Sequence, residues 1–171
     1  MHTRCPPPKR FKPAGTILWT RYSPTAPPFA RGRRKRTGRR AQGIRYEQRG
    51  HDFFEKLYGT RYIPSPWFQF LEEDSCAPRW CQPDALLFDP AQGRIHILEF
   101  KLQHTSDAWW QLRQLYFPVI RSIFPKALWD IALCEVVKWF DPSTAFPEKI
   151  VMAEKPEIVL GGELGVHIWR P

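Results

Sequence analysis

Two apolar segments joined by a turn occupy the middle of the chain. The first, residues 85–88, is a continuous apolar run, which is typical of a short buried strand. Over the second, residues 94–101, apolar and polar side chains alternate, as they do along a strand whose two faces differ. Turn-forming residues separate the two segments: Asp89, Pro90 and Gly93. The pattern therefore predicts a β-hairpin over residues 82–101.

One face of the second predicted strand changes from apolar to charged side chains at its C-terminal end. Ile95 and Ile97 share their face with Glu99 and Lys101, so we expect this face to enter a cleft at its C-terminal end. Asp84 precedes the first strand and would lie close to Glu99. Two carboxylates about 4 Å apart repel by roughly 4 kcal/mol at an effective dielectric of about 20. This repulsion predicts raised pKa values, a bound cation, or both, and Mg²⁺ suits one or two carboxylates.

A second interpretation of these residues needs no cation. Asp84 could open a strand at a solvated edge, while Glu99 and Lys101 form an exposed ion pair, which contributes little free energy. Ile95 and Ile97, on the same face just upstream, favour the buried arrangement instead.

Pro83-Asp84, followed after the turn by Glu99-Phe100-Lys101, resembles the signature of the PD-(D/E)XK nuclease superfamily, and the resemblance covers roughly residues 44–136. It implies an α/β fold with a central mixed β-sheet flanked by helices, as in the restriction-endonuclease-like core. It also implies a Mg²⁺-dependent deoxyribonuclease, with Mn²⁺ as a substitute and endonuclease favoured over exonuclease, and phage or mobile-element origin is one expectation. Asp84 and Glu99 would then bind the metal, and Lys101 would position the attacking water.

Residues 44–58 have the spacing of an amphipathic helix. Its apolar stripe consists of Phe53, Phe54, Leu57 and Tyr58. At about 100° per residue, Glu47 falls on the inward side of this helix. In the resembled superfamily the first helix often supplies an acidic residue to the metal site, and that residue would be Glu47 here. Alternatively, Glu47 pairs with Arg45, Arg49 or His51 at the helix start.

Residues 107–117 form the next expected helix, which Pro118 should kink or end. Many members of the resembled superfamily carry a Gln on this helix that approaches the substrate backbone, in some groups with a Tyr four residues later. Gln111 is therefore a further candidate catalytic residue. Here position 115 is Leu115 and the tyrosine is Tyr116, so the chain departs from the exonuclease-like pattern.

Further strands are expected over residues 65–70, 128–137, 157–160 and 166–169. A connecting loop is expected over residues 72–81. Its acidic residues Glu72, Glu73 and Asp74 should be solvated, because no calcium-loop spacing accompanies them. The cysteines lack the paired spacing of zinc ligands, and Cys134 is expected in the core.

A length of 171 residues with 43% hydrophobic content suits one domain with a sizeable core. No apolar run approaches the roughly 18 residues of a membrane span, and no secretory signal is visible, so we expect no membrane partner and a cytoplasmic location. The aromatic content exceeds what one core absorbs, which suggests a homodimer interface or a base-stacking platform. The candidates for this surface are Trp110, Phe117, Trp139 and Phe140.

The net charge of +9 is distributed unevenly. Residues 1–42 carry 12 Lys or Arg and no acid, whereas residues 43–171 carry 14 basic and 17 acidic residues. Seven prolines also lie in the first segment, so we expect residues 1–42 to form a disordered, DNA-binding arm ahead of a nuclease-like domain over residues 43–171. Within this arm, Trp19 and Tyr22 would dock as part of a strand or stack on bases. The nucleic-acid-binding residues would be Arg31, Arg33, Arg34, Lys35, Arg36, Arg39 and Arg40.

Other functions stay open at this point. The arm could be a nuclear address, a solubilising extension, or an arm for RNA or a protein partner. The domain could be a noncatalytic DNA-binding or assembly protein that retains the nuclease fold. It could also be a junction- or end-processing enzyme of the resolvase or exonuclease-like kind.

Overall fold

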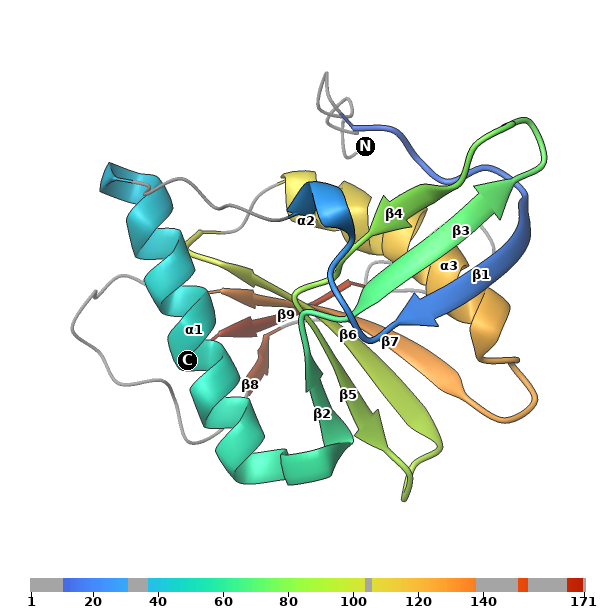
Figure 1. Cartoon of the computed structure of the whole chain (residues 1–171). Helices are drawn as coiled ribbons and strands as arrows, with labels where there is room; N and C mark the ends of the chain where they lie inside the picture. The colour runs from blue at the N-terminus through green and yellow to red at the C-terminus, as the bar shows by residue number, and fades with distance from the viewer. Residues whose placement is uncertain (1–10, 31–36, 104–105, 138–150, 154–165, 171) are drawn as a thin grey trace, which may run out of the picture.

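The structure is a computed structural model that describes residues 11–30, 37–103, 106–137, 151–153 and 166–170. In this part of the chain, a six-stranded sheet, a three-stranded sheet and two helical stretches form a mixed α/β fold (Figure 1). The expectation of an α/β protein is therefore confirmed at this level. No helix among the described residues is both long and apolar enough to span a bilayer.

The six-stranded sheet has the strand order β2-β5-β6-β7-β9-β8. Its strands are β2 (Tyr62–Pro64), β5 (Ala85–Asp89), β6 (Arg94–Lys101), β7 (Asp130–Val137), β8 (Val151–Ala153) and β9 (Val166–Arg170). The predicted hairpin is confirmed as the antiparallel pair β5 and β6. Strand β7 runs parallel to both β6 and β9, while β8 pairs antiparallel with β9 and β2 pairs antiparallel with β5. The sheet is therefore mixed, and β6 and β7 lie at its centre.

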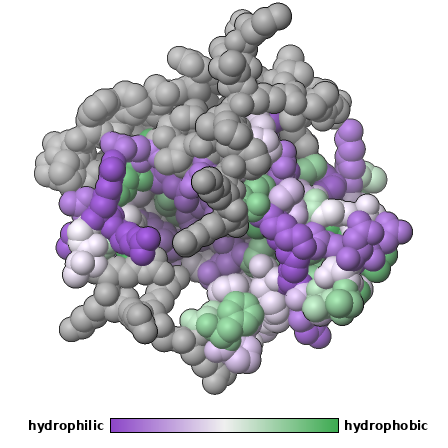
Figure 2. Space-filling model, turned by 90° about the horizontal axis from the view of Figure 1, so that it is seen from above, coloured by the Kyte–Doolittle hydropathy of each residue, from purple (hydrophilic) through white to green (hydrophobic). Residues whose placement is uncertain are grey.

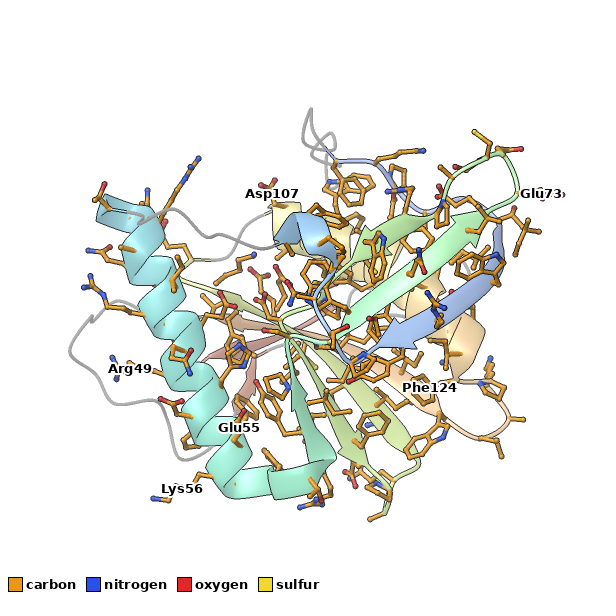
Figure 3. The ribbon with its side chains drawn as sticks, viewed as in Figure 1. Arg49, Glu55, Lys56, Glu73, Asp107 and Phe124 are labelled. Carbon is orange, nitrogen blue, oxygen red and sulfur yellow. The ribbon has the colours of Figure 1, made fainter. Side chains whose placement is uncertain are left out.

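Helix α1 (Gly38–Tyr58) covers one face of this sheet (Figure 1). It begins six residues before the predicted start at residue 44 and is followed by the 3-10 turn η2 (Gly59–Arg61). Its buried side chains pack with the side chains of β5, β6 and β7 that point to this face. The cluster consists of Tyr46, Phe54, Tyr62, Ala85, Leu87, Leu98, Phe100, Ala132, Cys134 and Val136. On the opposite side of α1, Arg49 and Lys56 extend away from the sheet (Figure 3).

The other face of the large sheet packs against a second helical stretch and the small sheet (Figure 1). The helical stretch consists of α2 (Ser106–Gln111), the π-helical segment η3 (Leu112–Tyr116) and α3 (Phe117–Ile123). The small antiparallel sheet has the order β1-β3-β4, with β1 (Ile17–Ser23), β3 (Trp67–Glu72) and β4 (Arg79–Cys81). The core on this side contains Phe68, Phe70, Cys81, Leu86, Ile95, Ile97, Leu112, Tyr116, Val119, Ile120, Ile131 and Leu133. Ile95 and Ile97 therefore lie on the face that leads toward Glu99.

Pro118 does not end the helical stretch, so of the two options predicted from sequence, a kink or an end, the second is excluded. The helix continues as α3 to Ile123, directly after the π-helical segment. Proline has no backbone N–H and cannot bond the carbonyl of Gln114. That carbonyl instead accepts a hydrogen bond from Ala14 N at 2.7 Å. The N-terminal segment thus supplies the donor that Pro118 lacks.

Part of the expected disordered arm is also ordered. Residues 17–23 form β1, which pairs with β3, so the option that Trp19 and Tyr22 dock as part of a strand is confirmed. The run from residue 16 to 23 contains no Pro or Gly and is rich in β-branched and aromatic residues, which favours a strand despite the flanking prolines. A 3-10 turn, η1 (Pro28–Ala30), follows.

Glu72 is not a solvated loop residue, as the sequence suggested, because it is the last residue of β3 and is 4% exposed. Its Oε1 accepts hydrogen bonds from Gly15 N and Arg79 Nη1, both at 2.7 Å. Arg79 also donates to the carbonyls of Lys12 and Pro13. Burial alone would raise the pKa of Glu72, but the hydrogen bonds and the charge of Arg79 lower it below its usual value. The carboxylate therefore anchors the N-terminal segment to the small sheet.

Other predictions fall partly outside the described residues. The strand expected over residues 128–137 is β7, and the one near residues 166–169 is β9. The strand expected over residues 157–160, together with Trp139 and Phe140, lies outside the described residues, as do positions 31–36 of the basic cluster. Arg39 and Arg40 are exposed in the first turn of α1, and Arg39 Nη2 donates to Gln103 Oε1 at 2.6 Å.

Candidate metal centre

Three acidic residues lie side by side across the large sheet. Asp84 immediately precedes β5, Glu99 lies on β6, and Glu135 is the register partner of Glu99 on β7. All three side chains lie on the face of the sheet that packs against the helical stretch. Leu86, Ile97 and Leu133, each two positions away along the chain, lie in the core on that side, and side chains two positions apart on a strand share a face. Neighbouring strands are about 4.8 Å apart, so a pair of ionised carboxylates here would repel by roughly 3–4 kcal/mol at an effective dielectric of about 20.

Hydrogen bonds fix the two acids of the hairpin. Asp84 Oδ2 accepts a bond of 2.7 Å from Phe100 N, and the Asp84 carbonyl accepts another of 2.7 Å from Ser65 N. Glu99 is 3% exposed, and its Oε1 accepts a bond from Lys101 Nζ at 2.5 Å. Glu99 Oε2 is buried and has no hydrogen-bond partner among the described residues. The structure therefore brings Asp84, Glu99 and Lys101 together, as the sequence predicted.

The electrostatics of the site disfavour ionised acids. Burial, followed by the negative charges of Glu99 and Glu47, raises the pKa of Asp84 well above its usual value. Burial also raises the pKa of Glu99, although the ammonium of Lys101 opposes this shift. A single ammonium carries one positive charge, so Lys101 alone does not neutralise the pair Asp84 and Glu99.

Lys101 keeps its charge in this surrounding. Desolvation lowers the pKa of a lysine, and the burial of Lys101 acts in that direction. The charges of Glu99, Asp84 and Glu135 and the hydrogen bond to Glu99 outweigh burial and raise the pKa of Lys101. The side chain is therefore an ammonium at neutral pH, suited to donate hydrogen bonds and to attract an anion.

Glu47 approaches the same site from helix α1. Its side chain is 24% exposed, and its negative charge helps to raise the pKa values of both Asp84 and Glu99. Glu47 Oε1 also lies 3.7 Å from His51 Nε2, one helical turn along α1. His51 is buried, and its Nδ1 lies 2.6 Å from the hydroxyl of Tyr62. Both interpretations from sequence agree with the structure: Glu47 faces the carboxylates of the sheet, and it also pairs with His51.

Gln111 is the last residue of α2, and its amide Oε1 is buried without a hydrogen-bond partner in the described part of the chain. Five residues later, at the end of the π-helical segment, Tyr116 lies in the core. Burial and then the charges of Glu99 and Asp84 raise the pKa of Tyr116 well above its usual value. The extra residue per turn of a π-helix shifts the side chains that follow it, which is why position 116 rather than 115 faces the carboxylates.

Sequence reasoning missed Glu135, which is fully buried in β7. The signal was available, because Glu135 is an acid inside the apolar run from Ile131 to Val137, as Glu99 is in its own strand. What the sequence could not supply is the parallel pairing of β6 with β7. Only this pairing places Glu135 beside Glu99.

The donor set fits a hard divalent cation. Mg²⁺ is bound through one or two carboxylates, with waters and substrate phosphates completing its shell. Asp84 and Glu99 supply this pair, and the unpartnered Glu99 Oε2 is an acceptor that a cation or a water would satisfy. Within the described residues, no three His, Cys, Asp or Glu side chains are already arranged to hold a metal ion by themselves. The fit therefore rests on two carboxylates, with Glu47 close by.

The chain was compared with protein-family models, with curated proteins and with solved structures, and none of them matches it. The function is therefore inferred from the geometry of the site.

Proposed function

We propose that this protein is a Mg²⁺-dependent deoxyribonuclease of the PD-(D/E)XK type, with a restriction-endonuclease-like core and endonucleolytic action. The observation that carries the proposal is the meeting of Asp84 and Glu99 on one face at the end of a hairpin, with Lys101 beside them. A buried pair of acids with raised pKa values destabilises the metal-free fold, and groups with such perturbed pKa values cluster at functional sites. Cation binding is such a function, and hydrolysis of a phosphodiester is the chemistry that the neighbouring ammonium suits.

In this proposal, Asp84 and Glu99 hold Mg²⁺, and Glu47 completes the site or helps to hold a second ion. The bound cation would lower the pKa of a water and offset the charge of the phosphate in the transition state. The residues of the chain carry out the remaining tasks. Phe100 N holds the Asp84 carboxylate in place through its hydrogen bond, and Lys101 Nζ holds the Glu99 carboxylate in the same way.

Lys101 has two tasks in the proposed reaction. As an ammonium it attracts the anionic phosphate and orients a water by donating hydrogen bonds. Because its pKa is raised, it is not a general base in the absence of metal. In this proposal Lys101 acts as a positioning group, and the proton of the attacking water leaves to solvent or to the phosphate.

The direct test is nicking of supercoiled DNA with and without Mg²⁺ or Mn²⁺. Lys101→Ala should lower the nicking rate by about 10²- to 10³-fold, because a positioned electrostatic group is removed. DNA binding measured in EDTA should stay within about twofold. Lys56→Ala is the matched control, since Lys56 is exposed on α1 and extends away from the sheet (Figure 3); it should cleave like the wild type.

A panel of supercoiled, linear, branched and single-stranded substrates separates the alternatives. Preference for junctions or ends over linear duplex would indicate a junction- or end-processing enzyme. DNA binding without metal-dependent cleavage of any substrate would refute the proposal and leave a noncatalytic DNA-binding or assembly protein.

A further inference from the structure

The outward face of the small sheet carries side chains that a solvated sheet face normally lacks. Arg21, Gln69 and Trp80 lie opposite one another across β1, β3 and β4. Arg21 Nη2 donates to Gln69 Oε1 at 2.7 Å, so this row is ordered. Trp67 lies two residues from Gln69 on β3 and shares its face, because side chains alternate along a strand. Faces of antiparallel sheets that meet water are usually polar, and here two tryptophans interrupt that pattern.

Phe29 of η1 joins these tryptophans in a surface that we call the aromatic platform (Phe29, Trp67 and Trp80). The ring centroids of the three residues are 6.2–6.3 Å apart, and each pair is arranged edge to face, at 75–87°. In this arrangement, neighbouring rings hold one another in place while part of each ring face stays uncovered. Seen from above, the described surface is largely hydrophilic, with small separate hydrophobic patches (Figure 2).

The exposure of the aromatic platform argues against a purely structural role. A phenylalanine that served only to anchor its segment would be buried, whereas Phe29 is 69% exposed. Trp67 and Trp80 are partly exposed on an ordered sheet. On the opposite face of the same sheet, by contrast, Phe68 and Phe70 are 2% and 0% exposed in the core. The platform is therefore an accessible aromatic surface next to an ordered sheet.

The charge around the aromatic platform favours an anionic partner. Arg21 is exposed on the same face of the sheet. In the sequence, Phe29 is followed after one residue by the basic run that includes Arg31, Arg33 and Arg34. Aromatic rings beside basic groups are how single-stranded nucleic acids are bound, because bases stack on the rings while cations meet the phosphates. An apolar protein partner would not require this positive charge.

The aromatic platform is connected to the candidate metal centre by short stretches of chain. Trp80 precedes Asp84 by only four residues, so their Cα atoms are at most about 14 Å apart. Trp67 follows Ser65 by two residues, and Ser65 N donates to the Asp84 carbonyl. Ser65 is held in place as well, since Gln82 Nε2 donates a hydrogen bond of 2.9 Å to its carbonyl. Its φ of 46° is rare outside glycine. At about 3.4 Å per stacked nucleotide, the Cα atom of Trp80 lies within about four nucleotides of the Cα atom of Asp84.

We infer that the aromatic platform stacks unpaired bases of the strand that is cleaved at Asp84 and Glu99. The preferred substrate is then DNA with a single-stranded segment within a few nucleotides of the scissile bond, such as an overhang, flap or gap. This inference rests on the proposed nuclease function for the cleavage step but not for the binding step.

Binding is tested with the full chain in EDTA, by fluorescence anisotropy of a labelled 12-nucleotide oligodeoxythymidylate and of a 12-base-pair duplex. Phe29→Ala and Trp80→Ala should each weaken single-strand binding by about 5- to 150-fold, the range for removal of one base-stacking ring, and duplex binding by less than twofold. Trp80→Phe should restore most of the affinity, because it keeps a ring at that position. Leu57→Ala is the control, since Leu57 is 52% exposed on α1, away from the small sheet.

The outcomes separate the two proposals. The stacking platform is overturned if folded Phe29→Ala binds the single strand as tightly as the wild type. It is also overturned if Phe29→Ala and Trp80→Phe each lose equal affinity for the single strand and the duplex. Unchanged affinity for both DNA forms would make a protein partner the better candidate. Loss confined to the single strand supports the stacking platform, even if the wild type nicks no DNA in Mg²⁺. In that case the proposed cleavage is wrong and the binding surface stands.

Discussion

Gly50 is the point at which helix α1 comes closest to the central sheet. A Cβ atom built on Gly50 would lie 2.5 Å from Cε1 and 2.8 Å from Cδ1 of Phe100. The Phe100 ring is 6% exposed and packs against Tyr46, His51 and Phe54. It therefore cannot move aside without disturbing three neighbours. Gly50→Ala should force α1 away from β6.

Two opposing contributions set the change in the free energy of unfolding that Gly50→Ala should cause. Replacing glycine by alanine inside a helix stabilises it by about 1 kcal/mol, while overpacking a closed core costs about 1–3 kcal/mol. Gly50→Ala should therefore lower the free energy of unfolding by up to about 2 kcal/mol. Gly43 is the matched control, because it lies in the same helix and a Cβ there would meet nothing within 4 Å. Gly43→Ala should stabilise the chain by about 1 kcal/mol.

Urea unfolding at neutral pH measures both variants. The helix-propensity gain is common to both, so the difference of about 1–3 kcal/mol between them isolates the clash with Phe100. In a chain of this size it corresponds to melting temperatures about 2–12 °C apart. Gly50→Ala should also slow the proposed nicking reaction, since Phe100 lies between Glu99 and Lys101 and its N–H holds Asp84. Equal stability of the two variants would show that α1 does not pack as tightly on β6 as described.

Three further predictions concern the acids and the basic run. The pKa of Asp84 is raised in the folded chain, so folding takes up a proton and metal-free stability falls as the pH rises above the usual carboxyl pKa of about 4. Asp84→Asn should thus have a higher free energy of unfolding than the wild type at pH 7 in EDTA, as measured by urea titration. The difference between the two proteins should disappear toward about pH 4, and equal stability at pH 7 would contradict the raised pKa. Mg²⁺ at about 100 times its dissociation constant should stabilise the wild type by about 2.7 kcal/mol, seen as a melting temperature about 5–11 °C higher, and a similar rise in Asp84→Asn would place the ion elsewhere. Replacing Arg31, Arg33, Arg34, Lys35 and Arg36 by serine should weaken DNA binding and flatten the slope of log affinity against log salt by about 0.9 for each phosphate that the run no longer neutralises, whereas an unchanged slope would remove the run from the interface.

The local parts of the site were predictable from sequence because they depend on short-range patterns. The turn between the two segments and the alternation from Arg94 to Lys101 determine that Glu99 and Lys101 share a face, and the hairpin brings Asp84 next to them. Helix phase was enough to place Glu47 inward, because a helix has a fixed angle per residue.

The remaining parts depend on pairings between distant segments. Glu135 joins the acids only because β7 pairs parallel with β6, and Glu72 is buried only because Arg79 and Gly15 reach it from elsewhere in the chain. The continuation of the helix past Pro118 depends on Ala14, about a hundred residues earlier. No local propensity contains such information, since each case is decided by a partner that supplies a missing charge or donor.

The docking of residues 14–23 changes what the basic run can do. A terminal tail would sweep a wide volume, but residues 31–36 join Ala30 of η1 to the start of α1, so this run is tethered at both ends. With seven peptide steps from Ala30 to Thr37, none of its positions is more than about 25 Å of extended chain from either end. Tethering at both ends limits how far the run can reach, and a cut by a protease within the run would remove one tether without detaching β1.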